Sequence, residues 1–321
     1  MNILITGAAG FIGYHLSLKL LKNNYKVFGI DNINSYYDVE LKKNRLRELK
    51  KYSNFYFNKL NLFNKNKINI IIQENNIKYI VHLAAQAGVR YSIENPKAYF
   101  KSNLEGFFNI LELSKSNNIK HLIFASTSSV YGNTNKFPLN EKMNTDKPVS
   151  FYAATKKSNE IMAYSYSYIY KIPATALRFF TVYGSYGRPD MALSKFTKSI
   201  LENKKISLFN SGNHTRDFTY VDDIVKGIDS VILKPSKNSI PYNCFNIGGG
   251  KPNKLKEFLK IIEINLGKKA KIKNLPLQLG DVKKTHSSVK SLNSYSSYQP
   301  TTKINKGIKE FVKWYKKYYK Y

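Results

Sequence analysis

Short apolar runs rich in β-branched and aromatic residues alternate with helix-like patterns through the first half of the chain. The runs that predict strands are Asn2–Thr6, Lys26–Asp31, Asn54–Asn58, Tyr79–Leu83, His121–Ala125 and Ala174–Phe179. The stretches that predict helices between them are Phe11–Lys22, Leu41–Lys51, Ala98–Ser116 and Tyr152–Tyr170. Because strands and helices alternate, the pattern predicts an α/β fold in which helices cover both faces of a parallel sheet.

After about residue 180 the alternation becomes irregular. Helical spacing recurs at Ala192–Asn203, Asp222–Lys234, Lys254–Leu266 and Ile304–Lys317. The change predicts two units. Residues 1–180, to which about 217–247 could return, form the sheet domain, and residues 181–216 and 248–321 form a smaller, irregular lobe.

Three glycines follow the first predicted strand and open the first predicted helix, in the segment Thr6–Gly13. Gly7 permits a tight turn, Gly10 lets the backbone approach a pyrophosphate, and Gly13 lets the helix pack closely on the sheet. Glycines punctuate many strand-to-helix turns, but these stand at the start of an alternating pattern. Their position predicts a doubly wound parallel sheet of the Rossmann type that binds a dinucleotide.

Asp31 ends the second predicted strand, about 20 residues after the glycines, where dinucleotide-binding folds place an acid. A carboxylate there accepts hydrogen bonds from the adenosine ribose hydroxyls and repels a 2′-phosphate. We therefore expect NAD as the cofactor in preference to NADP. An ordinary turn acid at Asp31 is the alternative interpretation.

Tyr152 and Lys156 are four residues apart at the start of a predicted helix, so both lie on one helix face. An ordinary tyrosine, with a pKa of about 10, is a poor base near neutral pH. A nearby ammonium and a positive nicotinamide ring would favour the phenolate, which can take a proton from a sugar hydroxyl while hydride leaves the same carbon. This spacing also arises by chance among 25 tyrosines. The hydroxyl run Ser126–Ser129, at the sheet edge where such folds bind ligands, supports the assignment.

These motifs give the chain a family resemblance. It resembles the extended short-chain dehydrogenases/reductases throughout its length. In that family a Ser or Thr, a Tyr and a Lys act together, and Thr127, Tyr152 and Lys156 match this catalytic motif. More narrowly, the chain is similar to UDP-glucuronate 4-epimerases of the capsule-biosynthesis type. The strings that carry the narrower similarity are Asp31–Asp38, His82–Ser92, Arg178–Gly184 and Gly187–Met191.

The resemblance also implies which residues bind NAD and a UDP-sugar. The implied cofactor contacts are Gly7, Gly10, Phe11, Ile12, Gly13, Asp31, Asn32, Asn61, Leu62, Leu83, Ala84, Ala85, Tyr152 and Lys156. The implied substrate contacts are Arg90, Ser128, Ser129, Thr181, Arg188, Arg216 (as a clamp on the diphosphate), Gln278 and Asp281. Two positions depart from the family pattern. Asn61 stands where relatives commonly carry an adenine-contacting Asp, and Gln278 stands where some UDP-sugar epimerases carry Arg.

Simpler interpretations of the substrate residues remain open. Ser128 and Ser129 also suit capping of a following helix, and Arg90 suits tying down its own loop. Arg216 also suits a strand edge, and Asp281 a polar loop.

The implied reaction oxidises a UDP-hexose at carbon 4, lets the transient ketone rotate, and returns hydride to its other face. A 4,6-dehydratase typically carries Asp-Glu directly after the catalytic threonine, where this chain has Ser128 and Ser129. A UDP-glucuronate decarboxylase forms the same 4-keto intermediate, which loses carbon dioxide when its carboxylate bond aligns with the ketone. We expect Ser128, Ser129 and Thr181, helped by Arg90 or Arg188, to hold the carboxylate out of alignment.

Two further alternatives stay open. One is a 4-epimerase of the UDP-glucose/UDP-galactose type. The other is a catalytically silent NAD-binding regulator, against which the intact Thr127, Tyr152 and Lys156 argue.

Composition changes this picture little. The net charge of +31 could indicate a nucleic-acid or membrane partner, but the lysines are scattered along the whole chain and many lie on predicted outer helix faces. We therefore expect neither a nucleic-acid nor a membrane partner.

No run approaches the roughly 18 apolar residues of a membrane span, and one cysteine excludes an intrachain disulfide, so we expect a cytoplasmic protein. The five histidines form no metal-ligand spacing, and we expect no metal. The family resemblance implies a homodimer through helices flanking the site, with Tyr164, Tyr166 and Tyr168 either at the interface or in the core.

Overall fold

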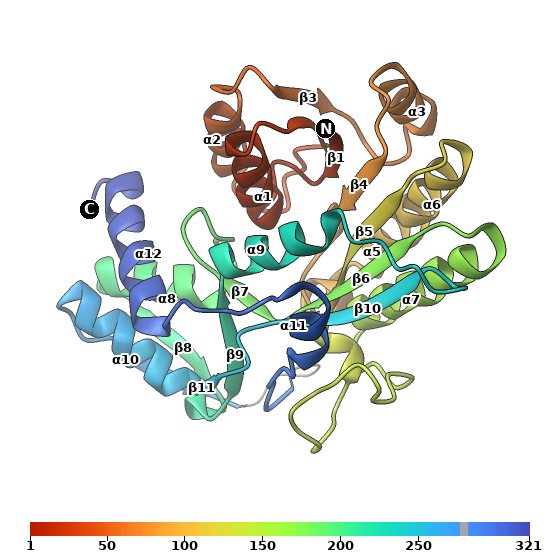
Figure 1. Cartoon of the computed structure of the whole chain (residues 1–321). Helices are drawn as coiled ribbons and strands as arrows, with labels where there is room; N and C mark the ends of the chain where they lie inside the picture. The colour runs from red at the N-terminus through yellow and green to blue at the C-terminus, as the bar shows by residue number, and fades with distance from the viewer. Residues whose placement is uncertain (277–281) are drawn as a thin grey trace.

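The computed structural model describes residues 1–276 and 282–321, and its main feature is a parallel sheet (Figure 1). Within these residues the sheet has seven strands in the order β10-β6-β5-β4-β1-β2-β3. The strands are β1 (Asn2–Thr6), β2 (Lys26–Asp31), β3 (Phe55–Lys59), β4 (Tyr79–His82), β5 (His121–Thr127), β6 (Ala174–Phe179) and β10 (Tyr242–Ile247). All neighbours pair in parallel, and the order reverses between β1 and β4. The predicted Rossmann-type sheet is confirmed.

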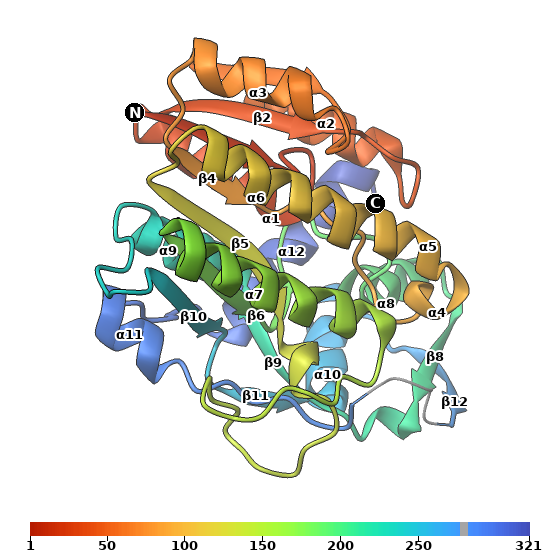
Figure 2. The same cartoon turned by 90° about the vertical axis from the view of Figure 1, so that its right-hand side faces the viewer.

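Helices cover both faces of this sheet, as the alternation predicted (Figures 1 and 2). One face carries α1 (Phe11–Lys22), α2 (Val39–Leu49), α9 (Val221–Ile232) and α11 (Lys290–Ser296), and the other carries α3 (Lys65–Glu74), α6 (Gly106–Ser116) and α7 (Phe151–Tyr170). Successive strand residues point to opposite faces, so Ile3 and Ile5 join the first core while Leu4 joins the second. Burial on both faces explains why the strands are apolar throughout.

The stretch 98–116, predicted as one helix, includes a π-helical turn. A short helix α4 (Tyr91–Glu94) precedes α5 (Pro96–Tyr99), the π-helical turn η1 (Phe100–Glu105) and α6. The wider turn brings Asn103 against the loop after β4, where its side chain bonds the backbone of Gln86 through both its oxygen (2.8 Å) and its nitrogen (3.0 Å). The predicted helical stretch is confirmed, since α5, η1 and α6 follow one another directly from Pro96 to Ser116, and the π-helical turn within it was not predicted.

The remaining elements form a lobe around a separate core. A three-stranded sheet has the order β11 (Pro252–Lys254), β9 (Thr215–Tyr220), β7 (Thr181–Tyr183), and a two-stranded sheet pairs β12 (Lys271–Leu275) with β8 (Lys205–Phe209). The lobe helices are α8 (Ala192–Leu201), α10 (Leu255–Leu266) and α12 (Ile304–Tyr319), and the short turn η3 (Asn210–Gly212) follows β8. A second short turn, η2 (Ser128–Tyr131), follows β5 of the large sheet. The aromatic rings of Phe218 and Phe258 stack at 4.0 Å in its centre.

The stretch 217–247 does not return to the large sheet as a whole. Only β10 pairs with β6 there, whereas β9 belongs to the lobe sheet. The division of the chain into two domains stays a prediction. Within the described residues, no helix is both long and apolar enough to cross a membrane.

Candidate active site

The glycine loop between β1 and α1 is packed too closely for side chains. Gly7 has a φ of +75°, and a Cβ on it would lie 2.8 Å from the backbone nitrogen of Ala84. A Cβ on Gly13 would lie 2.1 Å from the carbonyl oxygen of Gly7, so a glycine at this position lets the start of α1 pack closely against the loop. Gly10 precedes α1 without a side-chain cap. The first N–H groups of α1 are therefore available to an anion such as a pyrophosphate.

Asp31 holds this loop from the end of β2. Its carboxylate accepts hydrogen bonds from the backbone nitrogens of Ala9 (3.1 Å) and Ile33 (2.8 Å). Burial raises the pKa of Asp31, while these bonds and the charges of Lys42 and Arg45 act in the opposite direction. A carboxylate has acceptor sites beyond these two bonds, so Asp31 is able to accept from ribose hydroxyls as well.

The other predicted cofactor residues lie around the same strand ends. Asn32 is exposed beside Asp31, while Asn61 is half-buried just beyond β3 and Leu62 is buried. After β4, the backbone nitrogens of Leu83 and Ala84 donate to the carbonyl and hydroxyl oxygens of Thr6, and Ala85 follows half-buried. The set thus borders the point between β1 and β4 where strand order reverses, which is where such sheets bind ligands.

Tyr152 and Lys156 lie in the first two turns of α7. Ser150 caps this helix by accepting a hydrogen bond from the backbone nitrogen of Ala153 at 3.2 Å. Tyr152 is half-buried and hydrogen-bonds the Thr127 hydroxyl at the end of β5. The structure therefore joins Thr127 and Tyr152 directly, with Lys156 on the next turn and only 2% exposed.

The surroundings of Tyr152 do not by themselves make it acidic. Burial raises the pKa of Tyr152, and the Thr127 hydrogen bond and the charge of Arg188 oppose this rise without cancelling it. The sequence analysis expected the Lys156 ammonium to lower this pKa, which stays a prediction, and the structure adds the charge of Arg188 as a cation that acts in this direction. The remaining stabilisation of a phenolate would have to come from a positively charged ligand such as an oxidised nicotinamide ring.

Lys156 has a pKa lowered to about 8, because burial disfavours its ammonium while the nearby Glu160 favours it. Glu160 accepts two hydrogen bonds from Arg178, at 2.8 and 2.7 Å, and one from Ser126 at 2.5 Å. This buried ion pair joins α7 to β5 and β6, one helical turn after Lys156. His82 packs at the end of β4 against Thr6 (2.8 Å), and burial lowers its pKa to about 3.

Two hydroxyl residues, Ser128 and Ser129, follow Thr127 at the sheet edge, and Thr181 lies just beyond the neighbouring strand. Thr127 accepts a hydrogen bond from the backbone nitrogen of Ser129 and donates to its hydroxyl, both at 3.2 Å. Ser128 and Ser129 begin the turn η2 and are half-buried. Thr181 follows β6, whose last residue, Phe179, pairs with Thr127. The cap of η2 is Thr127 and neither serine, so the alternative in which Ser128 and Ser129 cap this turn is wrong, and a ligand-facing role for them stays a prediction.

Arg188 belongs to a polar cluster beside Tyr152. Its guanidinium forms a bidentate pair with Asp190, at 3.0 and 2.5 Å, and the Tyr36 hydroxyl donates to Asp190 at 3.4 Å. Gly88 lies against this cluster, since a Cβ there would be 2.8 Å from the Tyr36 hydroxyl. The loops after β2, β4 and β7 therefore meet at Arg188, a position suited to an anionic ligand group.

The other predicted substrate residues lie toward the lobe. Arg90 is exposed and stands over the Phe209 ring of β8, 4.9 Å from its centre. Arg216, on β9, donates to the carbonyl oxygens of Thr215 (3.1 Å) and Lys283 (3.2 Å). Gln278 and Asp281 lie outside the described residues.

Several residues of the site escaped the sequence analysis. Asn103, Arg45 and Asp190 act through contacts with segments distant in the chain, for which no local pattern exists. Glu160 carried a usable signal: it lies four residues after Lys156 and eight after Tyr152, on the same helix face.

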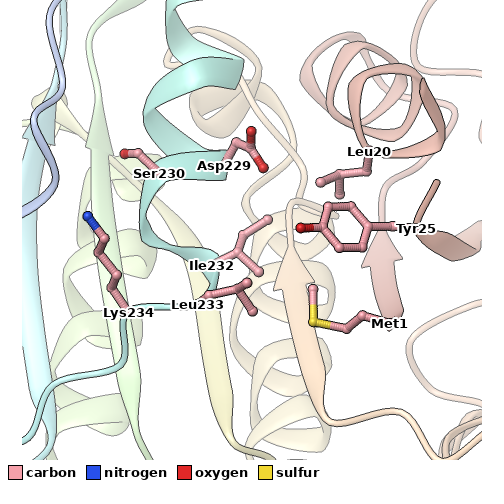
Figure 3. A pocket seen from close by; sticks show the side chains of 8 residues that line it. All are labelled: Met1, Leu20, Tyr25, Asp229, Ser230, Ile232, Leu233 and Lys234. Carbon is pink, nitrogen blue, oxygen red and sulfur yellow. The ribbon is translucent and has the colours of Figure 1, made fainter. Parts of the chain in front are cut away.

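A pocket of about 200 Å³ lies elsewhere, between α1 and α9 at the amino ends of the strands (Figure 3). Its wall includes Met1, Leu20, Tyr25 and Leu233. Ligands of doubly wound sheets bind at the carboxyl ends, so this pocket is separate from the candidate site.

In the described part of the chain, no three His, Cys, Asp or Glu side chains gather as a metal site would require.

Comparison with known proteins finds relatives along the whole chain. The model of the NAD dependent epimerase/dehydratase family matches residues 3–248. Protein CapI of Staphylococcus aureus is 49% identical, over 100% of both chains. A probable UDP-glucuronate 4-epimerase of Rhizobium meliloti (strain 1021) is 42% identical, over 100% of this chain and 98% of its own. The crystal structure of a UDP-glucuronic acid 4-epimerase from Bacillus cereus, in complex with UDP-glucuronic acid and NAD, matches with a TM-score of 0.94 at 34% identity, over 99% of this chain and 100% of that one.

The buried Lys156 predicts a pH-dependent stability. Its pKa is about 8 in the folded protein and 10.5 ordinarily, so the unfolded chain binds more protons between these values. Stability must therefore rise with pH across this window, by about 3 kcal/mol. Lys156→Met removes the penalty, and we expect it to stabilise the protein near pH 7 but not near pH 10.5. Urea unfolding from pH 7 to 10.5 measures this, with Lys260→Met on exposed α10 as the control. A constant difference between wild type and Lys156→Met would contradict the prediction.

Proposed function

The chain belongs to the NAD dependent epimerase/dehydratase family, and on this premise we propose that it interconverts UDP-glucuronate and UDP-galacturonate by NAD-dependent 4-epimerisation. The observation that carries the proposal is the pair of hydroxyls next to Thr127, Ser128 and Ser129, beside a Tyr152 that Thr127 hydrogen-bonds, with Thr181 two residues after the strand partner of Thr127. Relatives named for UDP-glucuronate 4-epimerisation align over nearly the whole chain.

Proton transfer falls to the chain's own residues. Tyr152 Oη takes the proton of the C4 hydroxyl, and the Thr127 hydroxyl fixes the phenol by its hydrogen bond. A bound NAD would supply the hydride acceptor at C4 and, once the 4-keto sugar had rotated, the hydride donor to the opposite face. Tyr152 then gives its proton back to the C4 oxygen, so that neither protons nor electrons are lost in a cycle.

The glycine loop, the uncapped start of α1 and Asp31 together suit this cofactor. Gly10 and the first N–H groups of α1 would hold the pyrophosphate, and Asp31 the adenosine ribose. The Asp31 carboxylate would repel the 2′-phosphate of NADP.

The 4-keto intermediate of a uronate is a β-keto acid. The geometry of its carboxylate therefore decides whether the product is the epimerised uronate or a decarboxylated pentose. It loses carbon dioxide if the bond to its carboxylate aligns with the π system of the ketone. Ser128, Ser129 and Thr181 supply three hydroxyls at the sheet edge, and Arg188 adds a bidentate cation. We assign these residues to the carboxylate, held out of alignment. UDP-glucuronate decarboxylase is the competing function if they fail to do so.

A 4-epimerase of neutral UDP-hexoses is the second alternative. A neutral C6 hydroxymethyl group would leave the Arg188 cation without an anionic partner from the substrate. Arg188 is half-buried and keeps Asp190 as a partner in either case, so our preference for the uronate rests on the additional attraction between this cation and a substrate carboxylate.

A homodimer through α6 and α7, in the cytoplasm, completes the proposal. These helices lie side by side on the outer face of the sheet (Figure 2). Ile161, Tyr164 and Tyr168 of α7 and Phe108 of α6 are exposed there. Tyr166 is engaged within the chain, since it donates to Glu112 at 2.7 Å. Exposed apolar side chains on adjacent helices are typical of an interface.

The function is tested by incubating the purified protein with UDP-glucuronate and identifying the sugar products. We expect UDP-galacturonate, and we expect Tyr152→Phe to lower kcat by roughly 10²- to 10⁴-fold because the proton acceptor is lost. Tyr168→Phe, on the exposed side of the same helix, is the matched control. A pentose product would identify a decarboxylase, turnover of UDP-glucose alone would identify a neutral-hexose epimerase, and no turnover would refute the proposal.

Thr181→Val should change the product more than the affinity for NAD. Valine keeps the shape of Thr181 but removes the hydroxyl, so the carboxylate is held less firmly and more of the intermediate decarboxylates. We expect the ratio of pentose to uronate product to rise several-fold, measured by chromatography of the nucleotide sugars. Thr301→Val, at an exposed position after α11, controls for the substitution itself. An unchanged product ratio would count against the assigned role of Thr181.

The dimer is tested by light scattering on a size-exclusion column. We expect the wild type to elute with twice the mass of the chain. The double replacement Ile161→Asp and Tyr168→Asp places charges on the α7 face and should give the single-chain mass. The control is the double replacement Ile264→Asp and Ile272→Asp. Both side chains are exposed in the lobe, so this variant should remain a dimer. A monomeric wild type would refute this part of the proposal.

A further inference from the structure

Arg45, on α2, is fully buried and uses its whole guanidinium as a donor to three loops. Nη1 donates to the Ala9 carbonyl at 2.8 Å and to the Tyr37 hydroxyl at 2.7 Å. Nε and Nη2 donate to the Tyr186 carbonyl at 3.2 and 2.6 Å, and Nη2 also reaches the Gly187 carbonyl at 3.5 Å. Ala9 belongs to the glycine loop and Tyr186 to the loop after β7, so one side chain joins the two.

The partners of Arg45 are unusual for a buried cation. The hydrogen-bond acceptors recorded for it in the described residues are carbonyl and phenol oxygens, and none is a carboxylate. A buried guanidinium that lacked these acceptors would be strongly unfavourable. The geometry is therefore maintained only while both loops keep their carbonyl oxygens in place.

The loop that Arg45 holds is strained. Tyr186 has a φ of +55°, a left-handed conformation that side chains other than Gly, Asn and Asp seldom adopt. Such a conformation persists only where the surroundings enforce it. Here the Tyr186 carbonyl receives two Arg45 donors, and its ring packs against Tyr14 and Trp314 at 4.9 and 5.0 Å. His15 of α1 supplies a further tie to the Ser185 carbonyl at 2.8 Å.

Arg188 follows directly after this strained turn. Its guanidinium lies close enough to Tyr152 to influence the ionisation of the phenol, and it is the cation assigned above to the substrate carboxylate. The position of the Tyr186 turn therefore sets where Arg188 can reach.

We propose that Arg45 is a positioning residue that ties residues 184–188 to the glycine loop and thereby sets Arg188 for binding the anionic UDP-sugar. The inference rests on the proposed function for the identity of the ligand, and on the structure alone for the tie between the loops. In this role Arg45 contacts neither NAD nor the UDP-sugar, because it acts through Arg188.

A first experiment tests the tie without any ligand. Hydrogen–deuterium exchange is measured on wild type, Arg45→Met and Arg47→Met; Arg47 lies on the same helix, exposed and paired with Glu40. Methionine keeps the length of Arg45 but donates no hydrogen bond. We expect the amides of 184–188 to exchange at least about tenfold faster in Arg45→Met alone, with α7 unchanged. Equal exchange at 184–188 in wild type and Arg45→Met would overturn the inference, whatever the protein's substrate.

A second experiment tests the action through Arg188. We expect Arg45→Met to raise KM for UDP-glucuronate about tenfold or more with a smaller change in kcat. In an Arg188→Ala background the same replacement should change KM less than about twofold, because both act through one contact. Additive effects, or a fall in kcat and Tm at constant KM, would show a merely structural residue and overturn the role. If Arg45→Met does not fold, Arg45→Lys, which keeps the charge but not the fork of donors, must show the same coupling. A wild type without turnover of UDP-glucuronate would refute the proposed function. The hydrogen–deuterium exchange experiment alone would then decide whether Arg45 holds residues 184–188 in place.

Discussion

A positive charge is buried only where the protein supplies a counter-charge or enough acceptor oxygens, and this constraint organises the structure around the site. Lys156 and Arg178 share Glu160 as their anion. Arg188 pairs with Asp190, whereas Arg45 is surrounded by carbonyl and phenol oxygens. The Arg178–Glu160 pair joins β6 to α7, and the bonds of Arg45 join the loops after β1, β2 and β7, so these two buried cations help to fix how the loops at the carboxyl edge of the sheet meet.

Burial acts in opposite directions on the two proposed catalytic groups. It raises the pKa of the Tyr152 phenol and lowers that of the Lys156 ammonium, because in both cases the neutral form is easier to bury. Burial therefore disfavours the charged form of both groups, but with a pKa of about 8 Lys156 still carries its proton at neutral pH, while Tyr152 is a neutral phenol. A positively charged nicotinamide beside the phenol would shift the balance toward the phenolate. Proton abstraction is then coupled to the presence of the oxidised cofactor, which restricts the chemistry to a site that is ready to accept the hydride.

Much of the fold could be predicted from periodicity. Strands such as β1 and β6 were found to the residue because burial on both faces of a parallel sheet demands continuous apolar runs. The sequence offered the place of β10 in the sheet only as one alternative, because Tyr242–Ile247 lies in an irregular stretch. The pairing of β10 with β6 is what defines this strand. The π turn in 98–116 escaped prediction for a similar reason. Asn103 selects it through the backbone of Gln86, a contact that no local pattern records.

The site divides in the same way. The sequence by itself determined that Tyr152 and Lys156 share a helix face, and that Gly7, Gly10 and Gly13 open the first helix, because the helical repeat and backbone sterics are local. Only the tertiary structure decided that the charge of Arg188 reaches the Tyr152 phenol, and that Arg45 joins the glycine loop to the turn before Arg188. Burial and electrostatic reach depend on which distant segments are brought together, and no spacing along the chain encodes them.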